Sequence, residues 1–145
     1  IKIKNENAIL LLVGNGNLEE EIKKQVEKLK LNDSVIFLGV RKDIPQLLMA
    51  MDIFVFPSLY EGMPNTVIEA QATGLKCVIS DTITKEANIT GLVKYLSINN
   101  DVDIWEKYIL DNCKYKREDT SKNFKEQGYD IKDVSNQFVN MIFVD

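Results

Sequence analysis

Short apolar runs alternate with segments of helical periodicity, and this alternation constrains the fold more than any other feature. The apolar runs occupy residues 8–13, 35–38, 53–56 and 77–80, with a shorter one at 94–98. Continuous runs of this length are typical of strands that are buried on both faces of a parallel sheet. Strands that alternate with helices predict an α/β fold, in which right-handed crossovers join the parallel strands.

The segments between these runs carry helix-start and helix-end signals. Asn17 and Glu20 have the spacing of a capping box. The apolar stripe that follows comprises Ile22, Val26 and Leu29. Asp43 is expected to cap a second, short helix. Pro64 and Gly74 are expected to mark the start and the end of a third helix, where proline and glycine are tolerated best.

The period changes to 3.6 residues after residue 101, which predicts a helical C-terminal tail. Trp105 and Tyr108 have helical spacing and are expected in the core. Asp130 is expected to cap a last helix. The residues of that helix expected to point inward are Val134, Phe138 and Met141. The basic cluster at residues 114–117 (KYKR) fits a solvated face or contact with an anionic membrane surface.

Composition excludes several kinds of site. The 145 residues include no histidine, which rules out Ser-His-Asp and Cys-His catalysis and His-ligated metals within this sequence. The two cysteines, Cys77 and Cys113, cannot form a four-cysteine zinc site, and their separation suggests reduced thiols in the cytoplasm. The net charge of −4 is diffuse, so no nucleic-acid partner is expected. No apolar run approaches the ~20 residues of a membrane span.

Parallel α/β sheets bind ligands beyond the carboxyl ends of their strands. The loops expected there are residues 14–17, 39–42, 57–65 and 81–86. The first reads GNGNLEE, but Glu19 occupies the place of the third glycine of a dinucleotide loop, and no acidic residue ends the next strand. A nicotinamide site is therefore not expected. Gly14 and Gly16 form either a tight turn or a backbone contact with a phosphate or sugar.

Residues 57–74 (PSLYEGMPNTVIEAQATG) combine a strand end with a helix start. The free N–H groups at a helix start carry roughly half a positive charge and bind phosphate. Glu61 precedes this helix start, Asn65 and Thr66 lie at it, and Glu69 lies one turn further on. A ligand with a central phosphate and hydroxyl-rich groups on both sides, such as a nucleoside diphosphate sugar, fits this arrangement.

The segment EGMPNTVIEA resembles the E-x7-E signature of retaining GT-B glycosyltransferases of the large group 1 family. Two longer blocks are similar to the same family, LLLVGNGNLEEEIKKQVEKLKLNDSVIFLG and MDIFVFPSLYEGMPNTVIEAQATGLKCVIS. The resemblance runs from about residue 8 to residue 80. It implies a Rossmann-like parallel sheet with flanking helices, the C-terminal half of a GT-B fold. We therefore expect residues 1–145 to form a single donor-binding domain.

The resemblance also implies roles for the residues that match its motifs. Glu61 would be the catalytic residue, which hydrogen-bonds hydroxyls of the donor sugar, and Glu69 would bind the ribose hydroxyls. The segment that faces the sugar and diphosphate would comprise Gly62, Met63, Pro64, Asn65 and Thr66. The residues against the base, mainly through their backbone, would be Gly39, Val40 and Arg41, with Gly14 and Gly16 in the floor of the site.

The implied activity is transfer of a hexose, with retention of anomeric configuration, from a nucleotide sugar that we expect to be a UDP-sugar. No metal is expected, because GT-B enzymes use a helix dipole and basic residues in its place. A missing N-terminal domain would bind a glycan or lipid-linked acceptor, so the chain alone is expected to be inactive. The full enzyme would assemble a polysaccharide in the cytoplasm, with peripheral association at the inner membrane face.

The sequence departs from the family pattern in two places. Lys76 and Cys77 stand where the family usually has a proline before the next strand. Family members also have an upstream strand, followed by a G-R pair and a lysine that clamp the diphosphate, and no segment of this sequence matches it. That strand would lie centrally in the strand order 3-2-1-4-5-6. The chain begins at Ile1 without Met, and we expect a fragment. Either the strand lies outside the chain, or the sheet closes the gap in another way.

Other functions stay open at this point. A sugar-nucleotide epimerase of the GT-B type would share the diphosphate site, but its histidines would lie partly in this half, which has none. A phosphorylase of this fold would need a lysine for pyridoxal phosphate that no motif marks. A non-enzymatic α/β module such as a receiver would need an acidic pocket at the strand ends, whereas Asp52 precedes its strand.

Overall fold

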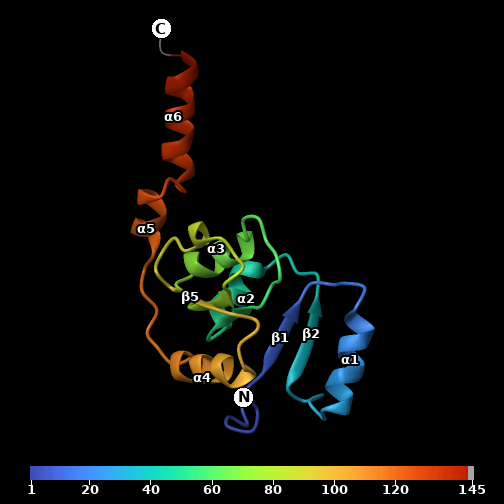
Figure 1. Cartoon of the computed structure of the whole chain (residues 1–145). Helices are drawn as coiled ribbons and strands as arrows, with labels where there is room; N and C mark the ends of the chain where they lie inside the picture. The colour runs from blue at the N-terminus through green and yellow to red at the C-terminus, as the bar shows by residue number, and fades with distance from the viewer. Residues whose placement is uncertain (144–145) are drawn as a thin grey trace. The chain divides into compact units, whose positions relative to one another are not determined.

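The computed structural model describes residues 1–143 of the chain (Figure 1). The chain divides into two compact units, the first comprising Ile1–Ile44 and the second beginning at Pro45. All the strand pairs in both units are parallel, as the alternation of strands and helices predicts. Among the described residues no helix is long and apolar enough to cross a membrane.

The first unit is one strand–helix–strand crossover. It contains β1 (Leu10–Val13), α1 (Glu19–Lys28) and β2 (Val35–Gly39), and β1 pairs with β2 to form a two-stranded sheet. The pairing is regular from Leu10 to Leu12 and then shifts, so that Val13 lies opposite Gly39. The two loops that follow the strands are in contact there, since the Gly14 N–H donates a hydrogen bond to the Gly39 carbonyl.

The expectation that both strands of this unit are buried on two faces is wrong. Leu10 and Ile36 are 49% and 44% exposed, and Val13 is also exposed. The apolar runs do form strands, because β-branched and aliphatic residues favour a pleated backbone. Burial on both faces, however, needs helices on both faces, and within this unit α1 is the single helix that the structure describes.

The start of α1 also differs from the capping-box prediction. The helix begins at Glu19, Leu18 occupies the N-cap position, and no side chain caps it. The Glu20 carboxylate instead accepts a hydrogen bond from Lys23 at 2.8 Å. Of the predicted apolar stripe only Val26 is buried, whereas Ile22 and Leu29 are exposed. Three acidic residues in the first turn still complement the helix dipole.

The second unit holds a three-stranded sheet of order β3-β4-β5. Its elements through the sheet are α2 (Ile44–Ala50), β3 (Phe54–Phe56), α3 (Asn65–Ala72), β4 (Cys77–Ser80), a 3₁₀ turn η1 (Lys85–Ala87) and β5 (Val93–Leu96). The α2 helix begins at the last residue of the first unit. All four residues of the central strand β4 are buried, as expected for a strand with neighbours on both sides.

The core of the second unit lies on both faces of β4. Val67 and Ala70 of α3 are fully buried, as expected for the helix face that packs on the sheet. Ile109 packs in a buried cluster with Val78 and Leu96. Trp105 and Tyr108 pack against this cluster, which confirms them as core residues.

Three helices follow the sheet, α4 (Val102–Asn112), α5 (Ser121–Glu126) and α6 (Ile131–Phe143). Asp130 caps α6 as predicted, since its carboxylate accepts a hydrogen bond from the Lys132 N–H at 2.9 Å. The prediction that Val134, Phe138 and Met141 point inward is wrong, because all three side chains are exposed. Helical periodicity shows that one face of a helix is apolar, but not that another element covers it.

The basic cluster at residues 114–117 is divided: Lys114 and Lys116 are exposed, as expected of a solvated face, whereas Arg117 contributes to the interior of the unit. Arg117 lies in the segment between α4 and α5 and is half-buried. Its guanidinium donates hydrogen bonds to carbonyl groups at the ends of α2 and α3, namely those of Leu48, Met51 and Thr73. A cation satisfies the unpaired carbonyls at a helix C-terminus well. Arg117 therefore holds two helix ends together and does not belong to a solvated basic face.

Candidate functional site

The predicted anion-binding helix start lies at the N-terminus of α3. Pro64 precedes the helix in an extended conformation (φ −79°, ψ 90°), and within the described chain no side chain caps this end. The first helical amides with an internal acceptor are those of Val67 and Ile68, which both bond to the Pro64 carbonyl. The N–H groups of Asn65 and Thr66 are thus left for solvent or a ligand.

The surroundings of this helix start keep it open. Gly62, Met63, Asn65 and Thr66 are all exposed, whereas the Pro64 ring is buried and anchors the turn. Since α3 connects two parallel strands, its N-terminus lies at the edge of the sheet where β3 and β4 have their carboxyl ends. Ligands of parallel α/β sheets bind at this edge.

Glu61 lies in the loop between β3 and α3 and is half-buried. One of its carboxylate oxygens, Oε1, accepts a hydrogen bond from the Ser58 hydroxyl at 3.0 Å. The Ser58 carbonyl in turn accepts hydrogen bonds from the hydroxyls of Ser80 and Thr82, the latter at 3.1 Å. The predicted site residue is therefore tied to the end of β4 by hydroxyl groups.

Sequence reasoning missed the three hydroxyl residues around Glu61. Ser58 lies three residues before Glu61, and that short spacing was the one signal available in the sequence. Ser80 and Thr82 lie 22 and 24 residues from Ser58, so only the pairing of β3 with β4 brings them to it.

Glu69 lies one turn into α3, and its side chain is exposed. Thr66 is exposed on the same helix, while Val67 and Gln71 are buried. The Gln71 side chain fixes the inner face of the helix, since its Oε1 accepts hydrogen bonds from two backbone N–H groups of residues 89 and 90. The Glu69 carboxylate is thus presented on a firmly held helix.

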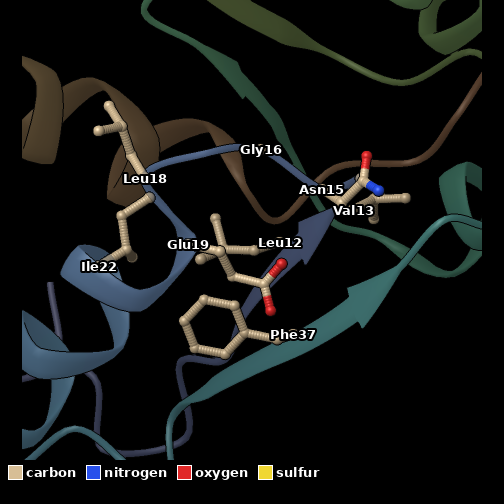
Figure 2. A pocket seen from close by; sticks show the side chains of 9 residues that line it. Leu12, Val13, Asn15, Gly16, Leu18, Glu19, Ile22 and Phe37 are labelled. Atoms are coloured by element: carbon tan, nitrogen blue, oxygen red, sulfur yellow. The ribbon is translucent and has the colours of Figure 1, made fainter.

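In the first unit the two predicted loops meet at Gly14 and Gly39. The Gly14 N–H donates to the Gly39 carbonyl at 2.8 Å. Both residues have positive φ angles, +117° and +60°, which favour glycine. An open hollow of about 240 Å³ lies beside the first loop and is lined by residues that include Gly14, Gly16 and Phe37. Figure 2 shows the Phe37 ring beside this hollow.

Arg41 and Val40 follow Gly39 on an exposed loop. The Arg41 guanidinium forms two hydrogen bonds with the Asp43 carboxylate, of 2.8 and 2.6 Å. This pair raises the pKa of Arg41 and lowers the pKa of Asp43, chiefly through the side-chain hydrogen bonds. Asp43 therefore precedes α2 as predicted, but its carboxylate is bound by Arg41 instead of by a helix amide.

The described part of the chain gathers no group of three His, Cys, Asp or Glu side chains that could hold a metal ion. Cys77 is buried in β4, as expected, and burial raises the pKa of its thiol to about 12. The site residues are therefore carboxylates, hydroxyls and backbone amides.

Comparisons with known proteins point to one protein family. A family model described as "Glycosyl transferases group 1" matches residues 1–131. The chain is 39% identical over 127 residues to the putative glycosyltransferase EpsF of Bacillus subtilis, covering 85% of this chain and 33% of that protein. It is 42% identical over 76 residues to the Escherichia coli UDP-Gal:alpha-D-GlcNAc-diphosphoundecaprenol alpha-1,3-galactosyltransferase, covering 52% of this chain and 20% of that protein.

Solved structures show the same fold. The crystal structure of the S. aureus TarM G117R mutant, in complex with Fondaparinux, alpha-GlcNAc-glycerol and UDP, superposes with a TM-score of 0.75 at 20% identity. The superposition covers 98% of this chain and 30% of TarM. The chain thus spans a third or less of the length of these relatives.

Proposed function

The chain belongs to the group 1 glycosyltransferase family and has the Rossmann-like fold of half a GT-B enzyme, and on that premise we propose that it binds the nucleotide-sugar donor of a glycosyltransferase. The observation that carries the proposal is the uncapped, exposed N-terminus of α3 between Glu61 and Glu69. Its amides suit a diphosphate, and the two carboxylates suit hydroxyl groups at either side.

The proposed mechanism assigns one task to each part of this site. Negative charge develops on the departing diphosphate, and the preorganised amides of residues 62–66 and the α3 dipole stabilise it. Glu61 is the catalytic residue, which orients the sugar ring and favours positive charge on it. Glu69 accepts hydrogen bonds from the ribose and is not a nucleophile. We propose retention, with the acceptor attacking from the face that the diphosphate leaves.

The other predicted donor-binding residues belong to the first unit. The backbone of Gly39, Val40 and Arg41 contacts the base, and Gly14 and Gly16 form part of the floor. The donor is a UDP-hexose, and no metal takes part. Two similar proteins support UDP, since the name of the E. coli relative includes UDP-Gal and the TarM crystal contains UDP.

Residues 1–145 are, in this proposal, one donor-binding domain that lacks its first strand. The strand orders support it. A sheet of order 3-2-1-4-5-6 without strand 1 leaves one pair and one triplet, and the chain has the orders β1-β2 and β3-β4-β5.

The remaining parts of the proposal concern the whole enzyme. Its N-terminal domain binds a glycan or lipid-linked acceptor, so the chain alone is inactive. The enzyme works in the cytoplasm at the inner membrane face, in the assembly of a polysaccharide. The name of the E. coli relative, whose acceptor carries diphosphoundecaprenol, supports a lipid-linked acceptor.

Calorimetry of the full-length enzyme with UDP, GDP and ADP tests the proposal. We expect UDP to bind and Glu69→Ala to weaken that binding. The matched control is Glu126→Ala, which removes an exposed carboxylate on α5. Chromatography of a UDP-hexose after incubation without acceptor separates the alternatives, because an epimerase would yield the epimeric donor. Failure of all three diphosphates to bind would refute the donor-site assignment.

A further inference from the structure

The Ser58 hydroxyl bonds to the Glu61 carboxylate and two further hydroxyls bond to the Ser58 carbonyl, and we propose that these three residues position Glu61 for the sugar of the donor. Ser58 is the positioning residue in direct contact with Glu61, while Ser80 and Thr82 position Ser58. The inference rests on the proposed function, because it concerns the orientation of the carboxylate assigned there to the donor sugar.

The contact between Ser58 and Glu61 restricts the carboxylate. The Ser58 Oγ lies 3.0 Å from Glu61 Oε1 and 3.2 Å from the Tyr60 carbonyl oxygen. The single hydroxyl hydrogen has two acceptors, and the ionised carboxylate is the stronger one. The bond leaves the other carboxylate oxygen of Glu61 available for a donor hydroxyl. Without the bond, a glutamate on a loop would adopt several rotamers.

The Ser58 backbone is held from the end of β4. Thr82 donates its hydroxyl to the Ser58 carbonyl at 3.1 Å, the Ser80 hydroxyl donates to the same oxygen, and the two hydroxyls lie 3.0 Å apart. Ser80 and Thr82 each have one hydroxyl hydrogen to donate, and the Ser58 carbonyl oxygen can accept two hydrogen bonds. If one of the two hydroxyls donates its hydrogen to the other, the second hydroxyl can still donate to the Ser58 carbonyl.

The loop that carries Glu61 needs such an anchor. Residues 57–64 form no helix or strand, and Leu59 and Tyr60 are 75% and 83% exposed. Few packing contacts therefore fix the loop. Ser80, in contrast, is fully buried at the carboxyl end of the central strand. The hydroxyl contacts transfer the fixed position of β4 to the loop, and catalysis is sensitive to displacements of about 1 Å.

The positioning role predicts an effect on turnover without an effect on diphosphate binding. Ser58→Ala should lower kcat for a UDP-hexose about tenfold, the scale of one hydrogen bond to a charged group. The Kd for UDP should change by less than about twofold, because the α3 amides that bind the diphosphate are untouched. Thr82→Val should lower kcat less than Ser58→Ala, and Thr82→Ser should restore it.

The test uses the full-length enzyme and four variants: Ser58→Ala, Thr82→Val, Thr82→Ser and the control Ser121→Ala. The control removes an exposed hydroxyl at the start of α5. Calorimetry with UDP gives Kd, and release of UDP from UDP-glucose, UDP-galactose and UDP-N-acetylglucosamine, with water as the acceptor of the sugar, gives kcat and KM. Thermal unfolding followed by circular dichroism reports whether each variant is folded.

The results decide separately on the positioning role of Ser58 and on the donor-site assignment. A fall in kcat for Ser58→Ala at constant Kd and constant melting temperature, with rescue at position 82 by serine, supports the positioning role. If kcat of Ser58→Ala is unchanged, or if its Kd for UDP rises by the same factor as its kcat falls, the positioning role is overturned. The donor-site assignment is unaffected by either result as long as the wild-type enzyme binds UDP. Wild-type enzyme that neither binds UDP nor releases it from the three donors overturns both proposals.

Discussion

Alanine at position 74 is expected to destabilise the chain more than alanine at position 128, although the two glycines end helices in the same way. Gly74 follows α3, and Gly128 follows α5. Each has a positive φ, +69° and +76°, and each lies in a Schellman motif. The motif around Gly74 is closed by hydrogen bonds from its own N–H and from the Leu75 N–H.

The difference lies in the space around the two residues. A Cβ at position 74 would lie 2.7 Å from the Glu118 carbonyl oxygen and 3.4 Å from the Arg117 Cβ, whereas a Cβ at position 128 would meet nothing within 4 Å. The left-handed backbone costs about 1–2 kcal/mol at either position. At position 74 the displaced backbone adds about 1–3 kcal/mol, so we expect a total of about 2–5 kcal/mol.

Urea unfolding of the wild-type chain, Gly74→Ala and Gly128→Ala, followed by circular dichroism, measures both losses. Displacement of the Glu118 backbone should also weaken the bonds that Arg117 makes to α2 and α3. Equal losses of unfolding free energy in the two variants would refute the reasoning, because the shared backbone cost would then explain everything.

Three further outcomes are expected. In the full-length enzyme, Glu69→Ala should weaken UDP binding by about 1.5–3 kcal/mol, measured by calorimetry; unchanged affinity would count against its role. Gln71→Leu should lower the free energy of unfolding by about 2–4 kcal/mol, because the buried Ala87 carbonyl and the half-buried Ile89 N–H lose their side-chain partner. Urea unfolding midpoints measure this loss, and an unchanged midpoint would contradict the prediction. The raised pKa of Cys77 predicts that the unfolding free energy falls as pH rises from 9.0 toward about 12, since in this range the thiol ionises only in the unfolded state. Cys77→Ala should remove this part of the pH dependence when urea unfolding is measured at a series of pH values. An unaltered pH dependence would disprove the prediction.

Much of the fold of this chain was predictable because its signals are local. The runs at residues 53–56 and 77–80 became β3 and β4, with boundaries one residue apart or identical. Gly74 ended α3 as expected, since few other residues adopt its backbone conformation. Burial was predicted less well. The stripe on α6 is apolar but exposed, and the run at residues 8–13 is exposed at Ile9, Leu10 and Val13, because burial depends on the neighbouring elements.

In the candidate site, too, local features were predictable and contacts between distant residues were not. Glu69 lies one turn into α3, so its place near the helix start follows from helix geometry and could be predicted. Glu61 lies in the loop before the helix, and the contacts that hold this loop depend on the pairing of β3 with β4. The Asp43 carboxylate was expected at a helix amide, but Arg41 offers two charged donors and binds it instead.

By itself, the order of residues determined that strands and helices alternate and that a helix start with bare amides lies between two glutamates. Only the tertiary structure decided which apolar faces are covered and which hydroxyls hold Glu61. The physical reason is that helix and turn geometry act over a few neighbouring residues, whereas the bonds from Ser80 and Thr82 to Ser58 exist only once β3 and β4 have paired.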